Sequence, residues 1–191
     1  MPTGRSAPPR TAEEHRGVRE DVRDGGSGPA ADRLLQLGWL QGLSTPVYGY
    51  APVAAQSTLT LAGKAAEGVK AVQLVKSPHD GDPAIKEFRS AMAKYERGQP
   101  ADFITLWGWA AAKAFVEIAR TIDGPITSDA LTAAYKKARA VDTGVAPVLN
   151  FSAEHHLGTR DVQKVVVRGG RWESQGDFFT PPSRDGNPDR D

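Results

Sequence analysis

The longest apolar stretch of the chain lies within residues 102–121, and it predicts a helix that other parts of the protein cover. The helix is expected to run from about Asp102 to Thr121 and to end before Gly124 and Pro125. Trp109 and Val116 lie off the main apolar face, so we expect the helix to be packed on more than one side. The main face consists of Phe103, Leu106, Trp107, Ala110, Ala111, Ala114, Phe115 and Ile118.

This apolar stretch is not a candidate for crossing a membrane. Thr105 and Gly108 interrupt it, and a bilayer span needs about 20 consecutive apolar residues. The chain carries 24 Lys and Arg against 23 Asp and Glu, and this balance argues against a nucleic-acid binder. It has no cysteine, which excludes disulfide scaffolds, thiolate zinc sites and cysteine nucleophiles.

Helical and strand patterns alternate along the rest of the chain. Asp82 and Pro83 are typical of a helix start, because proline fits the first helical position and aspartate caps it. Gly169 and Gly170 predict a tight turn between two strands. The alternation and the final hairpin indicate an α/β fold. Further helices are expected at residues 30–40, 58–67 and from 128 onward, and strands at 46–50, 69–75, 148–151, 162–167 and 171–173.

Apolar side chains at regular spacing predict which faces of these elements are buried. The strand at residues 46–50 has Val47 and Tyr48 as its buried candidates. The helix that starts at Asp82 has one apolar stripe, and the helix from residue 128 has a second one. These stripes are Ile85, Phe88, Met92 and Tyr95 in the first helix, and Leu131, Ala134, Tyr135 and Ala138 in the second.

The two ends of the chain differ from its middle. Residues 1–29 and 180–191 contain too few apolar side chains to offset the entropy lost on ordering, so we expect the first to be disordered or weakly helical and the second disordered. Residues 1–29 also lack the apolar core of an export signal. The sequence therefore predicts one globular domain at residues 30–179.

Known catalytic and metal-binding patterns are missing from the sequence. His79-Asp80 and His155-His156 do not have the spacing of a zinc site, and we interpret both as polar loops. Neither a nucleophile elbow nor a phosphate-binding glycine loop is present. We therefore expect no enzymatic activity, no metal and no cofactor.

Aromatic residues are the best candidates for binding a ligand. Tyr48 and Tyr50 lie at the end of a predicted strand, and ligands of α/β sheets collect beyond the carboxyl ends of strands. Trp109 lies early in the apolar helix. Aromatic side chains at such a place offer large contact area at low entropic cost. The alternative is that these residues belong to the core, and that interpretation is favoured for Trp107.

Several blocks, in their order along the chain, resemble the C-terminal part of the branched-chain amino acid (Leu/Ile/Val) type of ABC-transporter substrate-binding proteins, the type I periplasmic binding protein family. Each block is weak alone, but the order is maintained over most of residues 28–178. The blocks are Ala62–Gly68 with the strand at 69–75, Asp82–Phe88, Gly108–Ala111, Asp123–Thr127, Asp142–Gly144, Asn150–Ser152, Gly158 and Gly176–Phe178.

The resemblance implies a solute-binding component of an ABC uptake system for an amino acid or a related small polar solute. Such a protein closes like a hinge around its solute and delivers it to a membrane permease. It also implies an extracytoplasmic location, whereas a chain that starts as this one does would stay in the cytoplasm. The alternative is a ligand-sensing or interaction module of a regulatory protein with the same fold.

The N-terminal half of the family pattern has no counterpart in this sequence. The resemblance therefore implies an incomplete type I periplasmic-binding-protein fold, with parts of both lobes and a C-terminal β-hairpin. We expect half a lobe to leave an apolar helix face uncovered, and a cleft with one wall to bind solute weakly. The candidate faces are Phe103/Leu106/Phe115 and Ile85/Phe88/Met92. Near residues 50 and 51, where amino-acid-binding members carry an acidic residue, this chain has Tyr50 and Ala51.

Overall fold

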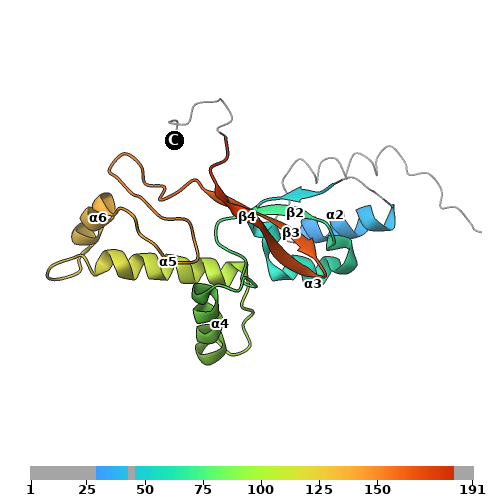
Figure 1. Ribbon diagram of the computed structural model, residues 1–191, viewed down its shortest axis with the longest axis horizontal. Coiled ribbons are helices and arrows are strands. Elements are labelled where there is room, and N and C mark those ends of the chain that lie inside the picture. Colours follow the sequence, from blue (N-terminus) through green and yellow to red (C-terminus); the bar gives the residue numbers. More distant parts are fainter. Residues whose placement is uncertain (1–28, 43–45, 183–191) are drawn as a thin grey trace, which may run out of the picture.

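A computed structural model describes residues 29–42 and 46–182, so most of what is predicted for the two ends lies outside the described residues. A small sheet with its helices forms one region, and a second region contains three further helices (Figure 1). The elements are α2 (Pro29–Leu40), β1 (Tyr48–Gly49), η1 (Ala51–Ala54), α3 (Gln56–Ala62), η2 (Gly63–Ala66), β2 (Lys70–Gln73), α4 (Pro83–Tyr95), α5 (Phe103–Ala119), α6 (Ser128–Lys137), β3 (Val162–Arg168) and β4 (Arg171–Phe179).

The sheet has four strands in the order β1-β2-β3-β4. β1 and β2 run parallel, while β2/β3 and β3/β4 are antiparallel. The predicted hairpin is confirmed: Arg168 pairs with Arg171, and the two glycines between them have φ of +55° and +71°. The last strand extends to Phe179, well beyond the expected 171–173, because β3 gives it a partner along most of its length.

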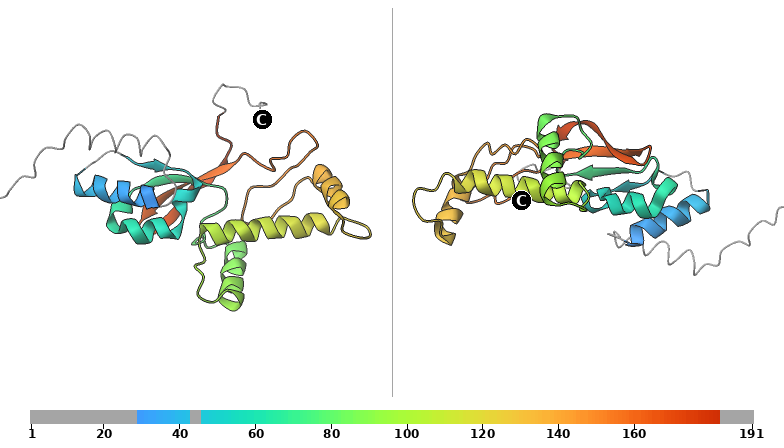
Figure 2. Two further views of the ribbon diagram at one scale, coloured as in Figure 1. Left: turned by 180° about the vertical axis from the view of Figure 1, so that it is seen from behind. Right: turned by 90° about the horizontal axis from the view of Figure 1, so that it is seen from below.

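Helices α2 and α3 cover one face of the sheet, as the view from below shows (Figure 2). Leu35 of α2 and Leu59 of α3 are buried there, and so are Val165 and Val167 of β3. The expected burial of Val47 and Tyr48 is wrong, because both are exposed. β1 is a two-residue edge strand that pairs with β2 only, so its side chains have few neighbours.

Helix α4 begins as the sequence predicts. The backbone N–H of Ile85 donates to Asp82 Oδ1 at 3.0 Å, and Pro83 is the first helical residue. Ile85 and Phe88 are fully buried, but Tyr95, predicted on the same stripe, is 70% exposed. The helix projects away from the other described elements (Figure 1), and none of these elements packs against its last turn.

Helix α5 buries one main stripe, and the expected cover away from that stripe is partial, because Trp109 is half-buried against Phe88 while Val116 is exposed. Asp102 and Thr105 form a reciprocal capping box at its start. A single stripe is buried: Phe103, Leu106, Ala110, Ala114 and Ile118. Trp107, favoured as a core residue, is 52% exposed, and Phe115 and Val116 are exposed too.

The uncovered apolar surface is therefore not where the sequence placed it. Phe103 and Leu106 are buried beneath neighbouring segments, and so are Ile85 and Phe88, so neither candidate face is open as a whole. Of the two expected faces, Phe115 is the member that is exposed. The exposed side of α5 combines Phe115 with Ile104, Trp107 and Val116, which the expected face does not include.

Helix α6 and the return segment at residues 138–161 complete the second region. Thr127 caps α6, because its hydroxyl accepts a hydrogen bond from the backbone N–H of Ala130. None of the residues of α6 is fully buried, and its stripe is only half-buried. The strand expected at residues 148–151 is reduced to one isolated bridge between Val141 and Leu149, because no neighbouring strand lies beside it in the described chain.

One hydrophobic core connects the two regions. It includes Val165 and Trp172 from the sheet, and Phe88 and Leu106 from the helices α4 and α5. Val145 of the return segment belongs to it as well. The described chain therefore holds the sheet and the second region together by shared packing.

Candidate functional site

The segment between β2 and α4 connects the two regions of the protein, because it leaves the sheet and enters the helical region. The backbone N–H of Lys76 donates to the carbonyl of Val145 at 2.8 Å. The buried hydroxyl of Ser77 donates to the carbonyl of Trp172 on β4 at 2.8 Å. This crossing segment, residues 74–82, is thus tied to the return segment and to the sheet at once.

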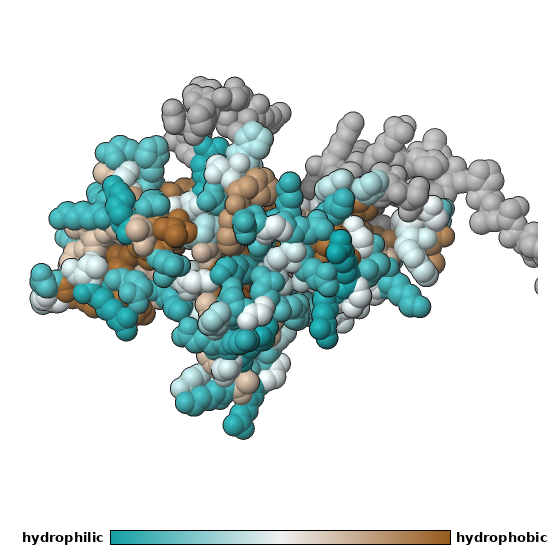
Figure 3. All heavy atoms as spheres, in the orientation of Figure 1, coloured by the Kyte–Doolittle hydropathy of each residue, from teal (hydrophilic) through white to brown (hydrophobic). Residues whose placement is uncertain are grey.

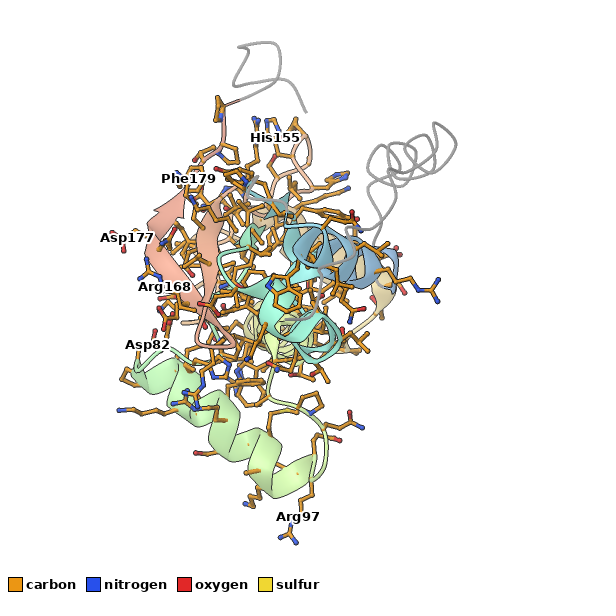
Figure 4. All side chains as sticks on the ribbon, turned by 90° about the vertical axis from the view of Figure 1, so that its right-hand side faces the viewer. Asp82, Arg97, His155, Arg168, Asp177 and Phe179 are labelled. Atoms are coloured by element: carbon orange, nitrogen blue, oxygen red, sulfur yellow. The ribbon has the colours of Figure 1, made fainter. Side chains whose placement is uncertain are left out.

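Charged side chains fix the same crossing segment from the helix side. Lys76 Nζ and Asp82 Oδ2 form an ion pair at 2.7 Å. Arg89 of α4 donates to the carbonyls of Pro78 and Asp80, at 2.9 and 3.3 Å. Figure 4 shows Asp82 at the beginning of α4.

The network continues onto the sheet. The hydroxyl of Ser174 on β4 lies 3.0 Å from a carboxylate oxygen of Asp80 and 3.1 Å from Oε1 of Gln163. Gln73, at the end of β2 and opposite Gln163, is fully buried, and its side-chain amide has no hydrogen-bond partner among the described residues. No motif in the sequence signals this set of residues, which appears there only as a polar run between a strand and a helix start.

Two titratable groups in the segment have shifted pKa values. Partial desolvation, together with the positive charges of Arg171 and Arg89, lowers the pKa of His79. Desolvation would raise the pKa of Asp82, but the hydrogen bonds from Lys76 and from a backbone N–H outweigh it, and the net pKa is lowered. Both shifts favour the charge state that each group has at neutral pH.

Trp109 lies on α5 and contacts helix α4. Its ring meets that of Phe88 edge-on, with centroids 6.0 Å apart and an interplanar angle of 62°. Its indole N–H is buried without a hydrogen-bond partner in the described chain, while the residue as a whole is half-buried. A buried donor without a partner is uncommon and costs stability.

Tyr48 and Tyr50 lie on β1 and just after it, at the edge of the sheet. They are 71% and 49% exposed, and Lys70 Nζ lies 5.6 Å from the centre of the Tyr48 ring. Within residues 29–42 and 46–182, neither tyrosine has a hydrogen bond or ring contact with Trp109. The two tyrosines are therefore close neighbours in the sequence, and Trp109 lies on a separate element.

The histidine pair and an open cavity lie elsewhere. His155 is on the far side of the molecule from Asp82 (Figure 4), in an exposed loop. Among the described residues, no group of three or more His, Asp and Glu side chains is placed to hold a metal ion.

An open cavity of about 790 Å³ lies between α5, α6 and residues 138–142, with Glu117, Ile118 and Lys137 in its wall. None of the three predicted ligand-binding aromatics lines it.

A comparison with protein families identifies this architecture. The periplasmic binding protein family profile matches residues 28–171. The chain belongs to the periplasmic binding protein family. No curated protein sequence is significantly similar to it. Within the described ranges, no helix of this family member is long and apolar enough to traverse a bilayer.

Solved structures share the fold. A branched-chain amino acid ABC transporter protein from Thermus thermophilus with bound valine has a TM-score of 0.71 at 19% identity, covering 88% of this chain and 50% of its own. A possible leucine/isoleucine/valine-binding protein from Rhodopirellula baltica has a TM-score of 0.72 at 22% identity, covering 79% and 41%. A solute-binding protein from R. palustris in complex with benzoate has a TM-score of 0.65 at 19% identity, covering 90% and 49%.

This chain spans about half the length of the solved structures that it matches. The expected fold class is confirmed: a mixed α/β, partial type I periplasmic-binding-protein fold that ends in a β-hairpin.

Proposed function

We propose that residues 30–179 form part of the solute-binding component of an ABC uptake system. The observation that carries the proposal is the family match over residues 28–171, combined with a fold shared with transporter binding proteins. The role is binding without covalent chemistry. The partners are a small polar solute and a membrane permease, and the working location is outside the cytoplasm.

The proposed solute class is broad, because the neighbours differ in what they hold. One structure contains valine and another contains benzoate, and both ligands are small and carry a carboxylate. No acidic side chain lies at residues 50–51 to hold an ammonium group. A small organic acid therefore suits this chain at least as well as an α-amino acid.

Tyr48, Tyr50 and Trp109 are the proposed contacts for the solute. The tyrosines offer exposed rings and hydroxyls at the edge of the sheet, and Trp109 offers the accessible part of its ring. The tyrosines and Trp109 lie on separate elements, and we propose that both face a cleft to which this chain contributes one wall. We expect dissociation constants of about 1 mM, where binding contributes roughly 4 kcal/mol.

Ligand-observed NMR on the full chain tests the proposal, with valine, leucine, benzoate and small aliphatic acids as probes. Tyr48→Ala should weaken binding of the best probe about tenfold, a loss of roughly 1.4 kcal/mol. Tyr95→Ala is the matched control, since Tyr95 is 70% exposed on α4, and it should leave binding unchanged. Absence of binding by all probes at about ten times the expected constant, or equal losses in both variants, would refute the proposed site.

A further inference from the structure

Four polar side chains lie together where the crossing segment leaves the sheet, and we call them the crossing cluster: Gln73, Gln163, Ser174 and Asp80. They belong to β2, β3, β4 and the crossing segment. Both glutamines are buried, whereas exposed hydrophobic surface gathers in another part, the region of α5 and residues 138–161 (Figure 3). The two amides therefore belong to the interior of the protein and not to its open surfaces.

Strand pairing determines how these side chains face one another. Gln73 and Gln163 are directly opposite each other in the antiparallel pair β2/β3, so their side chains lie on the same side of the sheet. The Cβ atoms of such a pair are about 4.5–5.5 Å apart, which is within the reach of two glutamine side chains. Ser174 pairs with Val165, two residues beyond Gln163, so its hydroxyl lies on that side too.

The amide of Gln163 has a fixed orientation. Its Nε2 donates to the carbonyl of Gly176 at 2.9 Å, and its Oε1 lies 3.1 Å from the hydroxyl of Ser174. The reversed orientation would place Oε1 against the carbonyl of Gly176, and two acceptors form no hydrogen bond. Oε1 of Gln163 is therefore an acceptor that needs a donor from this cluster.

Two acceptors compete for the single hydrogen of the Ser174 hydroxyl. One is Oε1 of Gln163, and the other is the carboxylate of Asp80, whose oxygens lie 3.0 and 3.3 Å from the hydroxyl. A hydroxyl donates one hydrogen bond, and an ionised carboxylate only accepts. At any moment, one of the two acceptors is therefore without this donor.

Gln73 has the additional donor that the cluster needs. Neither Nε2 nor Oε1 of its buried amide has a hydrogen-bond partner among the described residues. A buried amide without a partner costs stability, which favours an arrangement in which it is paired. Because the side chain is fully buried, a further segment of polypeptide cannot reach it without opening this side of the sheet. The acceptor on the directly opposite residue is Oε1 of Gln163.

We propose that the crossing cluster is a hydrogen-bond switch that sets how firmly the crossing segment is held to the sheet. In the released arrangement, Ser174 donates to Gln163, and the amide of Gln73 is unpaired. In the fastened arrangement, Gln73 Nε2 donates to Gln163, and Ser174 donates to the carboxylate of Asp80. The exchange requires rotation of one hydroxyl and one amide, without a change in strand pairing.

The fastened arrangement opposes opening of the crossing segment. Hydrogen bonds to ionised groups are about twice as strong as those between neutral groups, so Ser174 holds Asp80 more strongly than it holds Gln163. Since the crossing segment connects the sheet to the helical region, the switch acts on the connection between the two regions of the protein.

Hydrogen exchange of backbone amides, measured by NMR on the full chain, tests the switch. Gln73→Met keeps the length of the side chain and removes its donor, so Ser174 stays on Gln163 and Asp80 loses its hydrogen bond. The backbone N–H of Asp80, which donates to the carbonyl of Ser77, should then exchange about tenfold faster, which corresponds to about 1.4 kcal/mol. The matched control is Gln175→Met, on the opposite side of β4 from Ser174, and it should leave this rate unchanged.

A double-mutant cycle tests whether the two glutamines act through each other. Gln163→Met removes the acceptor for which Gln73 and Ser174 compete, so Ser174 donates to Asp80 whatever residue is at position 73. Adding Gln73→Met to this variant should therefore leave the exchange rate of the Asp80 amide unchanged. The difference between the two backgrounds measures the coupling.

Ser174→Ala gives a second readout, which remains informative if the methionine variants fold poorly. Without the hydroxyl, Oε1 of Gln163 is left to Gln73, so the side-chain amide signals of Gln73 should shift and become protected from exchange. Unchanged Gln73 signals would overturn the proposal. Slower exchange of the Asp80 amide in Gln73→Met, an additive double-mutant cycle, or equal effects of Gln73→Met and Gln175→Met would overturn it as well. These measurements use no solute, so their outcome is independent of the proposed binding function.

Discussion

Replacing Phe88 with alanine tests whether the packing of α4 joins the two regions of the protein. Phe88 is fully buried in the core, and its ring meets the ring of Trp109 edge-on at 6.0 Å. Alanine removes the ring, leaves a cavity where sheet, α4 and α5 come together, and takes the packing partner from Trp109.

The expected cost in unfolding free energy is large, because alanine removes buried apolar surface and also leaves a cavity. Truncation of a buried phenylalanine to alanine costs about 3–5 kcal/mol, of which the ring pair with Trp109 accounts for about 0.5–1.5 kcal/mol. Domains unfold with a free energy of about 5–15 kcal/mol, so this loss is a major part of the total. For a chain of this size it lowers the melting temperature by roughly 6–20 °C, at about 2–4 °C per kcal/mol.

Urea denaturation, followed by circular dichroism, measures the change in the free energy of unfolding. Phe88→Leu should lose about 1–2 kcal/mol, because it keeps most of the volume and removes the ring contact. Tyr95→Ala, on the same helix and on the same predicted stripe, is 70% exposed and should change the free energy by about 0.5 kcal/mol or less. A loss below about 1 kcal/mol for Phe88→Ala, or similar losses for Phe88→Ala and Tyr95→Ala, would refute the packing described for α4.

Three other predictions concern the segments around the crossing. Gly144→Ala should destabilise the fold by about 1–2 kcal/mol in the same urea assay, because Gly144 has φ of +76° and a Cβ there would lie 2.9 Å from that of Ala84; an unchanged midpoint would contradict this. Ser77→Ala should cost about 1–3 kcal/mol, since it leaves the buried carbonyl of Trp172 without its donor; Ser77→Thr tests whether the hydroxyl suffices. The lowered pKa of His79 means that the folded state resists protonation there, so its contribution is intact above the ordinary histidine pKa of 6.5 and is lost as the pH falls below it. Melting temperatures at pH 7.5 and 5.5 should therefore differ more in the parent than in His79→Gln, and equal differences would exclude this role.

The local signals in the sequence located the elements well where one short motif decides the structure. Asp82 with Pro83 placed the start of α4, since capping depends on residues within one turn. The two glycines at 169 and 170 placed the hairpin, because a tight turn needs positive φ there.

Burial was predicted less well, because it depends on which other element covers a given face of a helix or strand. Trp107 and Tyr95 have the spacing of core residues, yet both are more than half exposed, since no element of the described chain covers them. The expected strand at residues 148–151 has high β-propensity but is reduced to a single bridge, because a strand forms only beside a partner. The ligand-binding role of Tyr48, Tyr50 and Trp109 stays a prediction.

The order of motifs along the chain determined the family and the fold class, because short-range chemistry sets where each helix and strand begins. The tertiary structure alone decided which side of each element meets the core. It brought Ser77 to the carbonyl of Trp172, 95 residues away, and it left one apolar side of α5 open to solvent. The physical reason is that burial and long-range hydrogen bonds are properties of a pair of surfaces, and a sequence pattern describes one surface at a time.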